Sequence, residues 1–226
     1  MAFINLFCNY QLKGFCVDFL LIIDHCEKKI SIKIAYFGPA LSGKTTSIKA
    51  LFSQFGKEEE ICSIESTVNR TLFFDYGTVT FQNQEWALKI HIYTTTGQDF
   101  YFVTRPITLR AVDGVIFVID SQEEVYERNL ISWNELISYF NETIDDLPII
   151  IAFNKQDLEN KFNPIDFLNT IRYQNYKNID TRYTSAKTKK GILECFEDML
   201  RLILRKYYDN KLVSTLNQRT INLTYL

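Results

Sequence analysis

The sequence predicts an α/β fold with a mostly parallel, six-stranded sheet and helices on both of its faces. Strand-like segments alternate with amphipathic helical segments along most of the chain, and this alternation is typical of parallel sheets. Residues 115–119 (VIFVI) and 148–153 (PIIIAF) are continuous apolar runs, as expected of strands that helices cover on both faces. The sheet should therefore lie at the centre of the core.

The first half of the chain supplies three strands and one helix. Residues 30–37 are β-branched and aromatic, and they lead through a glycine-bearing loop into a helical segment at 45–55. Residues 71–81 and 86–93 alternate apolar and polar side chains, which predicts two strands joined by a short turn. We expect this hairpin to add one antiparallel edge. The stretch 56–70 is polar and lacks a strong periodicity.

The second half of the chain supplies the remaining strands and two long helices. Apolar residues recur every three or four positions over 126–140, and again from residue 192 to residue 207, which predicts two amphipathic helices. Residues 179–183 are the sixth predicted strand. In sheets of this kind the functional loops lie at the carboxyl ends of the strands, so we expect the chemical motifs there.

The composition suits one globular domain with short appendages. The chain has 226 residues, 46% of them apolar, and a net charge of −2, which argues against a broad basic surface for nucleic acid. Five cysteines at irregular spacing indicate neither a disulfide framework nor a zinc site, so we expect a reducing, cytoplasmic compartment. No signal peptide or transmembrane segment is predicted, because the longest apolar run near the N-terminus covers only residues 19–23.

Residues 38–45 read GPALSGKT, a full match to the phosphate-binding loop G-x-x-x-x-G-K-[ST] between a strand and a helix. The glycines let backbone N–H groups curl around phosphate oxygens at the positive end of a helix. Lys44 would neutralise the β and γ phosphates, and the Thr45 hydroxyl would ligate a magnesium ion. The nucleotide-binding residues predicted from this loop are Gly38, Ala40, Ser42, Gly43, Lys44, Thr45 and Thr46.

Two further motifs predict that the base is guanine. Residues 154–157 read NKQD, and the Asp157 carboxylate can accept two parallel hydrogen bonds from guanine N1 and N2, which adenine does not offer. Asn154 would support the loop and purine N7, while the stem of Lys155 would cover the base. Residues 184–187 read TSAK, and the backbone N–H of Ala186 would meet guanine O6. The residues predicted from this second motif are Ser185, Ala186 and Lys187.

With these motifs in this order, the chain resembles the Ras-like small GTPases, and several stretches resemble their MglA-type branch, the GTPases of gliding motility and cell polarity. The specific marks are GPALSGKTT at 38–46, RTLFFD at 70–75, YTTTGQDFY at 93–101, DGVIFVIDSQ at 113–122 and NKQD at 154–157. The resemblance covers residues 30–208 and implies a P-loop NTPase fold of the Ras-like kind, GTP or GDP with Mg2+ as ligands, and hydrolysis of GTP.

The resemblance also implies roles for four residues near the γ phosphate. Thr71 matches the threonine that joins the magnesium shell, and Gly97 matches the glycine whose N–H meets the γ phosphate. Gln98 matches the glutamine that orients the attacking water. Arg70 matches the residue thought to act as an intrinsic arginine finger in this branch, a role suited to its planar, charged fork.

Two positions depart from the usual Ras-like pattern. Thr94 stands where most relatives have the aspartate of D-x-x-G, as it also does in the MglA-type branch, so a carboxylate for the magnesium shell must come from elsewhere. Asp75 is the candidate, and a strand-end surface carboxylate is the alternative reading of that residue. Ala40 puts a methyl group where glycine is common, and this methyl group would crowd the transferring phosphate, Gln98 or Arg70 and so slow turnover.

The domain organisation follows from the extent of the resemblance. The G domain should cover residues 30–208, preceded by an extension of unknown role at 1–29 and followed by a tail at 209–226. The extension is open to several readings, among them a docking strand, a weak membrane-surface contact or an inserted segment. As partners, the resemblance implies a Roadblock-type homodimeric regulator and effectors that distinguish the nucleotide states.

Three function classes compete. The leading hypothesis is a GTP-hydrolysing molecular switch whose loops gate partner binding. The alternative is a scaffold locked on GTP with negligible hydrolysis, which Ala40 and Thr94 would favour. An ATP-dependent kinase or transport ATPase would keep the phosphate loop but leave the NKQD and TSAK motifs unexplained.

Overall fold

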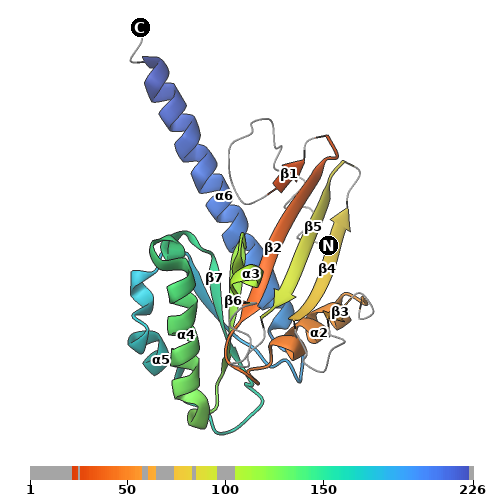
Figure 1. Cartoon of the computed structure of the whole chain (residues 1–226), viewed down its shortest axis with the longest axis vertical. Helices are drawn as coiled ribbons and strands as arrows, with labels where there is room; N and C mark the ends of the chain where they lie inside the picture. The colour runs from red at the N-terminus through yellow and green to blue at the C-terminus, as the bar shows by residue number, and fades with distance from the viewer. Residues whose placement is uncertain are drawn as a thin grey trace.

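The computed structural model describes residues 22–24, 26–57, 61–64, 74–82, 85–95 and 105–223, and within them eight strands form one sheet (Figure 1). The strands are β1 (Ile22–Asp24), β2 (Lys29–Phe37), β3 (Ile61–Ile64), β4 (Phe74–Gln82), β5 (Ala87–Thr94), β6 (Gly114–Asp120), β7 (Ile149–Asn154) and β8 (Ile179–Tyr183). The α-helices are α2 (Lys44–Gln54), α3 (Arg105–Leu109), α4 (Tyr126–Phe140), α5 (Pro164–Thr170) and α6 (Ile192–Leu223). Short 3-10 turns cover Glu123–Val125, Asn141–Asp146 and Tyr173–Asn175.

The strand order is β3-β4-β5-β2-β6-β7-β8, with β1 paired to β2. The pairs from β5 to β8 are parallel, and β4 is antiparallel to β5. The predicted α/β class, the six expected strands and the antiparallel edge are therefore confirmed. The sheet has two short strands that were not predicted, β1 and β3. Strand β3 was missed because it lies in the polar stretch 56–70 and gains its strand character from pairing with β4.

The hairpin of β1 and β2 attaches part of the predicted N-terminal extension to the sheet. Residues Ile22–Asp24 pair antiparallel with the first three residues of β2, while β6 pairs with the last four. Because β5 takes the other side of β2 along its length, β1 and β6 share one side. The Asp24 carboxylate closes the turn by accepting hydrogen bonds of 2.9 Å from the N–H groups of Cys26 and Glu27.

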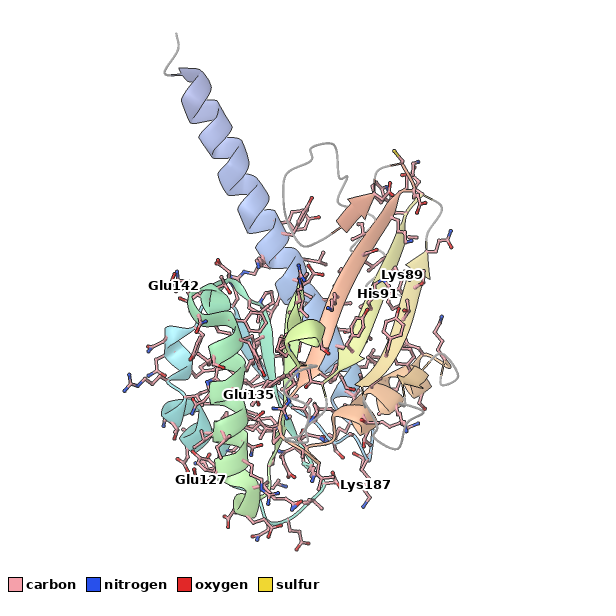
Figure 2. All side chains as sticks on the ribbon, in the orientation of Figure 1. Lys89, His91, Glu127, Glu135, Glu142 and Lys187 are labelled. Atoms are coloured by element: carbon pink, nitrogen blue, oxygen red, sulfur yellow. The ribbon has the colours of Figure 1, made fainter. Side chains whose placement is uncertain are left out.

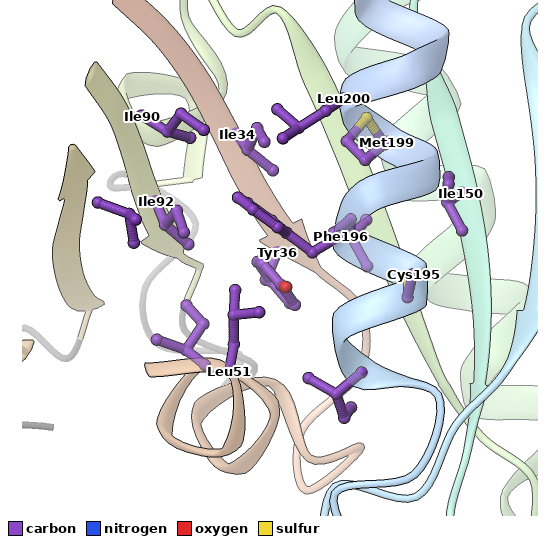
Figure 3. Close-up of a cluster of buried hydrophobic side chains, with 14 of the residues drawn as sticks. Ile34, Tyr36, Leu51, Ile90, Ile92, Ile150, Cys195, Phe196, Met199 and Leu200 are labelled. Carbon is purple, nitrogen blue, oxygen red and sulfur yellow. The ribbon is translucent and has the colours of Figure 1, made fainter. Parts of the chain in front are cut away.

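The core consists of two layers of apolar side chains, one on each face of the sheet. Strand β2 contributes to both, since Ile34 and Tyr36 face one layer while Ala35 and Phe37 face the other. Helices α2 and α6 cover the first layer (Figure 3). Helices α4 and α5 cover the second, where Trp133 is among the largest buried side chains. Helices on both faces were predicted and are observed.

Helix α6 is longer than the predicted amphipathic segment. Its first turns pack Phe196, Met199 and Ile203 into the core, and the backbone stays helical through the predicted tail to Leu223, over 32 residues in all. No glycine or proline occurs after residue 191 to end the helix. At 1.5 Å per residue its length is about 48 Å, and Figure 1 shows it extending past the sheet. In the part of the chain that the structure describes, no helix is both long and apolar enough to cross a membrane.

Candidate functional site

The carboxyl ends of β2, β6 and β7 and the loop after β8 meet at one edge of the sheet. The phosphate loop at residues 38–43 follows β2 and enters α2, while the NKQD segment begins with the last residue of β7. The TSAK segment follows β8, and its Lys187 lies at the lower end of the molecule in Figure 2. The structure thus brings the predicted phosphate and base motifs to one place.

Two glycines of the phosphate loop are required by their surroundings. Gly38 has φ +144 and Gly43 has φ +100, a backbone region that side chains rarely adopt. A Cβ at Gly38 would overlap the carbonyl of Val118, and a Cβ at Gly43 would overlap the amide nitrogen of Asn154. The loop can lie this close to β6 and β7 only because these positions lack side chains.

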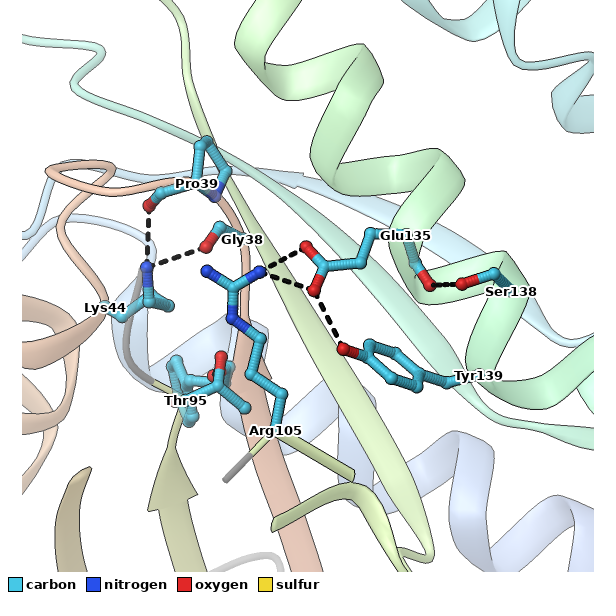
Figure 4. A network of polar contacts seen from close by, with 9 residues as sticks. Gly38, Pro39, Lys44, Thr95, Arg105, Glu135, Ser138 and Tyr139 are labelled. Carbon is cyan, nitrogen blue, oxygen red and sulfur yellow. Dashed lines mark hydrogen bonds and ion pairs between the residues drawn. The ribbon is translucent and has the colours of Figure 1, made fainter. Parts of the chain in front are cut away.

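Lys44 is buried above the loop that precedes it. Its ammonium donates hydrogen bonds to the carbonyls of Gly38 (2.8 Å) and Pro39 (2.6 Å) (Figure 4). Burial, with a further contribution from the nearby Arg105, lowers the pKa of Lys44 to about 7, and Glu135 opposes this shift. Two buried cations beside one carboxylate form a site that an anion would stabilise. The donor set therefore fits the phosphates of a nucleotide.

Arg105 and Glu135 form a buried ion pair beside the phosphate loop. Arg105 is the first residue of α3 and donates to both carboxylate oxygens of Glu135 on α4 (Figure 4). The Tyr139 hydroxyl donates to the same carboxylate over 2.9 Å, and the guanidinium lies 5.9 Å from the centre of the Phe37 ring. Sequence reasoning missed this pair. The one local signal was the i,i+4 spacing of Glu135 and Tyr139 on a predicted helix.

The predicted magnesium ligands are only partly described. Thr45 and Thr46 are exposed in the first turn of α2, where the Thr45 hydroxyl could reach a metal held by nucleotide phosphates. Asp75 lies in β4, and its backbone pairs with Ser63 of β3; its side chain is outside the described part. Among the described residues, no cluster of three or more His, Cys, Asp or Glu side chains could hold a metal without a nucleotide.

Asn154 joins the three loops of the site. Its side-chain amide donates to the carbonyl of Ser42 in the phosphate loop over 2.8 Å. Its side-chain oxygen accepts hydrogen bonds from the Thr184 hydroxyl (3.3 Å) and the Ala186 N–H (2.9 Å). The predicted loop-supporting contacts of Asn154 are thus present. The Ala186 N–H, predicted to meet guanine O6, here donates to Asn154, so an incoming O6 would compete for that N–H.

Lys155 is held by a carboxylate that sequence reasoning did not include. Its ammonium lies 2.5 Å from Asp120 Oδ2 at the end of β6, and its backbone adopts φ +64. The buried Asn129 of α4 fixes Asp120 in turn, donating to its carbonyl over 2.8 Å and accepting from its N–H over 3.2 Å. This chain of contacts holds the side chain of Lys155, whose stem was predicted to cover the base, against the end of β6.

Asp157 is exposed, as a residue that meets a ligand should be. The Ser185 hydroxyl donates to one of its carboxylate oxygens over 2.6 Å, and this hydrogen bond holds the pKa of Asp157 below its ordinary value. The carboxylate therefore stays ionised at neutral pH and offers only acceptors, which is what guanine N1 and N2 require. The structure thus brings together Asp157 and Ser185, which were predicted separately from the NKQD and TSAK motifs.

Four predicted residues lie outside the described part of the chain: Arg70, Thr71, Gly97 and Gln98. Thr94, which stands at the usual aspartate position, is buried. Its neighbour Thr95 donates its N–H to the carbonyl of Tyr36 over 3.0 Å, so the end of β5 is fixed beside the phosphate loop. Ala40 is half-buried in the loop itself.

Comparisons with known proteins match this geometry. The model of the Ras family matches residues 33–205. The mutual gliding-motility protein MglA of Myxococcus xanthus is 31% identical over 188 residues, which cover 80% of this chain and 95% of that protein. Ras-related protein Rab-32C of Dictyostelium discoideum is 25% identical over 80% of this chain and 77% of its own length. Ras-related protein Rab-18-B of Danio rerio is 26% identical over 77% of this chain and 80% of its own length. The family match includes all three loops of the site.

Proposed function

This chain belongs to the Ras family of small GTPases, in its MglA-type branch, and from that membership we propose that it hydrolyses bound GTP to GDP with the help of Mg2+. As a member of this family it is a GTP-binding switch. The proposal concerns the chemistry at the γ phosphate, the metal, the residues that act there and the identity of the regulator.

The observation that carries the proposal is the convergence of three loops on Asn154. The phosphate loop, the NKQD segment and the TSAK segment are linked by hydrogen bonds of this one side chain. A nucleotide that spans the site would therefore present its phosphates and its base to a single connected unit. This arrangement supports a guanine nucleotide as the ligand.

The described residues suggest how the nucleotide is held. Lys44 would turn from the loop carbonyls to the β and γ phosphates, whose charge would restore its ordinary protonation. The Thr45 hydroxyl would hold Mg2+, which neutralises charge on the β and γ phosphates when bound. The Asp157 carboxylate would accept hydrogen bonds from guanine N1 and N2.

Hydrolysis depends on residues proposed from the family pattern. Gln98 would orient the attacking water, and Arg70 would spread positive charge over the oxygens of the transferring phosphate. Thr71 and Gly97 would contact the metal and the γ phosphate, and Asp75 would supply a carboxylate to the magnesium shell. A Roadblock-type homodimer is the proposed regulator.

A second candidate is a scaffold that holds GTP with negligible turnover. Two positions favour it: Ala40 adds a methyl group inside the phosphate loop, and the buried Thr94 replaces a carboxylate that usually supports the metal. If the protein is such a scaffold, GTP would stay bound after loading, and the resulting change in partner affinity would be permanent.

Nucleotide competition and single-turnover kinetics test both candidates. We expect GTP, but not ATP, to displace a labelled GDP, and Asp157→Asn to shift the preference toward xanthine nucleotides. Equal displacement by ATP would overturn the guanine assignment. We then expect GTP loaded with Mg2+ to be hydrolysed faster than free GTP, and Arg70→Ala or Gln98→Ala to slow this by tenfold or more. A background rate with and without a Roadblock-type regulator would favour the scaffold.

A further inference from the structure

None of the helices in the described part of the chain covers one face of the sheet over strands β4 and β5 and the first half of β2. Ile32 of β2 and Ile90 of β5 point to the opposite face and pack in the layer that α2 and α6 cover, while only Ala35 and Phe37, in the second half of β2, are buried on the same side as Lys33 among the described residues of β2. Among the described helices, α4 and α5 lie over the other half of the sheet (Figure 1). Helix α3 borders the open face, where Lys33 donates to the carbonyl of Arg110 over 2.7 Å.

The side chains on this open face are basic and aromatic. Strand alternation turns every second residue outward, and Figure 2 shows Lys89 and His91 of β5 on the viewer's side of the sheet. We call the surface formed by six residues the basic face. They are Lys29, Lys33, Tyr76, Lys89, His91 and Tyr93.

Cross-strand contacts hold the aromatic part of the basic face in place. The Tyr76 hydroxyl lies 2.9 Å from Nδ1 of His91. In the strand register, His91 is paired with Thr78. The rings of Tyr76 and Tyr93 are 4.8 Å apart, and the ammonium of Lys33 lies 5.0 Å from the centre of the Tyr93 ring. These contacts already hold the side chains in place, so little ordering cost remains for a partner to meet.

The charge of the basic face differs in sign from that of the whole chain. The outward positions of the three strands, counted over residues 29–33, 76–82 and 87–93, carry three lysines and no carboxylate, whereas the chain has a net charge of −2. Two carboxylates of the described residues lie at its margin: Glu27 lies 3.8 Å from the Lys29 ammonium, and Asp113 accepts the Lys33 N–H over 2.7 Å. The surface therefore favours a negatively charged partner.

The size and chemistry of the basic face suggest the kind of partner. Three strands about 4.8 Å apart and seven residues long present about 300 Å2, well below the roughly 800 Å2 per partner of a stable dimer. Among the described side chains, the exposed large apolar ones are Leu41, Ile131, Ile165 and Tyr183, and none lies on this face. A membrane-binding surface normally inserts apolar groups, so a protein segment is the better fit.

We propose that the basic face docks an acidic segment of a partner protein in a transient complex. The chain connectivity gives this contact a role, because β4 follows directly on the segment with Thr71, and β5 leads directly into the segment with Gln98. The proposal rests on the proposed switch for this role: the acidic segment would belong to an effector that reads the nucleotide state.

Fluorescence anisotropy with a fluorescein-labelled peptide of eight glutamates tests the proposal on the full chain loaded with GDP or a non-hydrolysable GTP analogue. We expect saturable binding at low salt, weakened about tenfold by Lys29→Gln/Lys33→Gln/Lys89→Gln. Because Lys33 is partly buried, Lys29→Gln/Lys89→Gln serves as a second variant and should weaken binding about fivefold. The charge-matched control is Lys49→Gln/Arg128→Gln/Lys177→Gln, which are exposed residues outside the basic face, with an expected change below twofold.

Several outcomes would overturn the proposal. One is an absence of peptide binding by protein that demonstrably holds nucleotide; another is an equal loss of binding in the control variant. A third is lysine-dependent binding to phosphatidylserine vesicles without binding to the peptide, which would make the face a membrane contact. Failure to load any guanine nucleotide would count against the proposed function, and measuring bound nucleotide first keeps the two failures apart.

Discussion

The side-chain amide of Asn154 donates a hydrogen bond of 2.8 Å to the main-chain carbonyl of Ser42, which lies 112 residues earlier in the chain. This single contact ties the loop that would read the base to the loop that would hold the phosphates. A distortion of either loop is therefore transmitted to the other. The consequences can be measured in both ligand affinity and stability.

Replacing Asn154 by alanine should disrupt both loops. Three hydrogen bonds of a buried side chain would be lost, leaving the Ser42 carbonyl and the Ala186 N–H without this partner. We expect the free energy of unfolding to fall by about 2–3 kcal/mol and GDP affinity to fall by at least 100-fold. Chemical denaturation and GDP titration check these values. Asn178→Ala, which removes one remote hydrogen bond to Asp145, should leave GDP affinity unchanged.

Gly43→Ala should reproduce the loss of nucleotide affinity that we expect for Asn154→Ala. The new methyl group would occupy the position of the Asn154 amide nitrogen and strain a backbone at φ +100. The control is Gly56→Ala, which has a similarly positive φ of +66 but no atom within 4 Å of the added methyl group. That variant should lose about 1 kcal/mol of stability and bind GDP normally. If both variants bound GDP equally well, the proposed contact would be irrelevant to ligand binding.

Removing one partner of the Arg105–Glu135 ion pair should destabilise the fold, whereas replacing both partners with apolar residues should change the free energy of unfolding much less. Glu135→Gln leaves a buried guanidinium without its countercharge and should lower the free energy of unfolding by about 3–5 kcal/mol. The double variant Arg105→Met/Glu135→Leu removes both charges and should recover most of that loss. Thermal and denaturant unfolding give the comparison. A double variant as unstable as Glu135→Gln would show that packing, rather than charge, sets the stability here.

Nucleotide binding should be coupled to proton uptake through Lys44. Its pKa of about 7 in the folded chain lies below the ordinary lysine value of 10.5, so the folded protein binds fewer protons than the unfolded chain between these values. The free energy of unfolding without nucleotide should therefore rise as pH increases from about 7 toward about 10. Bound phosphates would raise the pKa of Lys44 again.

Calorimetry of GDP binding at pH 8, in buffers with different ionisation enthalpies, measures this proton uptake. We expect close to one proton taken up per GDP at that pH, and less at pH 6.5. The Glu135 carboxylate raises the pKa of Lys44. Removing this carboxylate should therefore lower that pKa further and move the onset of proton uptake to lower pH. Uptake that stays constant between pH 6.5 and pH 8 would exclude Lys44 as its source.

Local motifs were predictable because their physics is local. The glycine spacing of residues 38–45 and the apolar spacing of residues 126–140 each describe one turn or one helix, and the structure has α4 over the predicted range. The convergence of the loops followed from the rule that parallel strands end at one edge. The partners within that edge were only partly foreseen.

The missed features depend on tertiary contacts. Arg105 and Glu135 lie 30 residues apart, and neither belongs to a motif, so only the packing of α3 against α4 makes them a pair. Asp120 ends an apolar strand, and its role became visible only when the NKQD loop placed Lys155 against it. Strand β3 is four residues long in a polar stretch, and its pairing with β4 decides its conformation.

The length of α6 has a practical consequence for experiments on this protein. From Ile203, which is buried in the core, to Leu223 the helix rises by about 30 Å, and it runs away from the loop at residues 184–187 that precedes it (Figure 1). A fluorophore or surface tether attached beyond Leu223 would thus be carried on a stiff spacer, remote from the nucleotide loops. Immobilisation through this end should leave both the bound nucleotide and the basic face accessible to partners in solution.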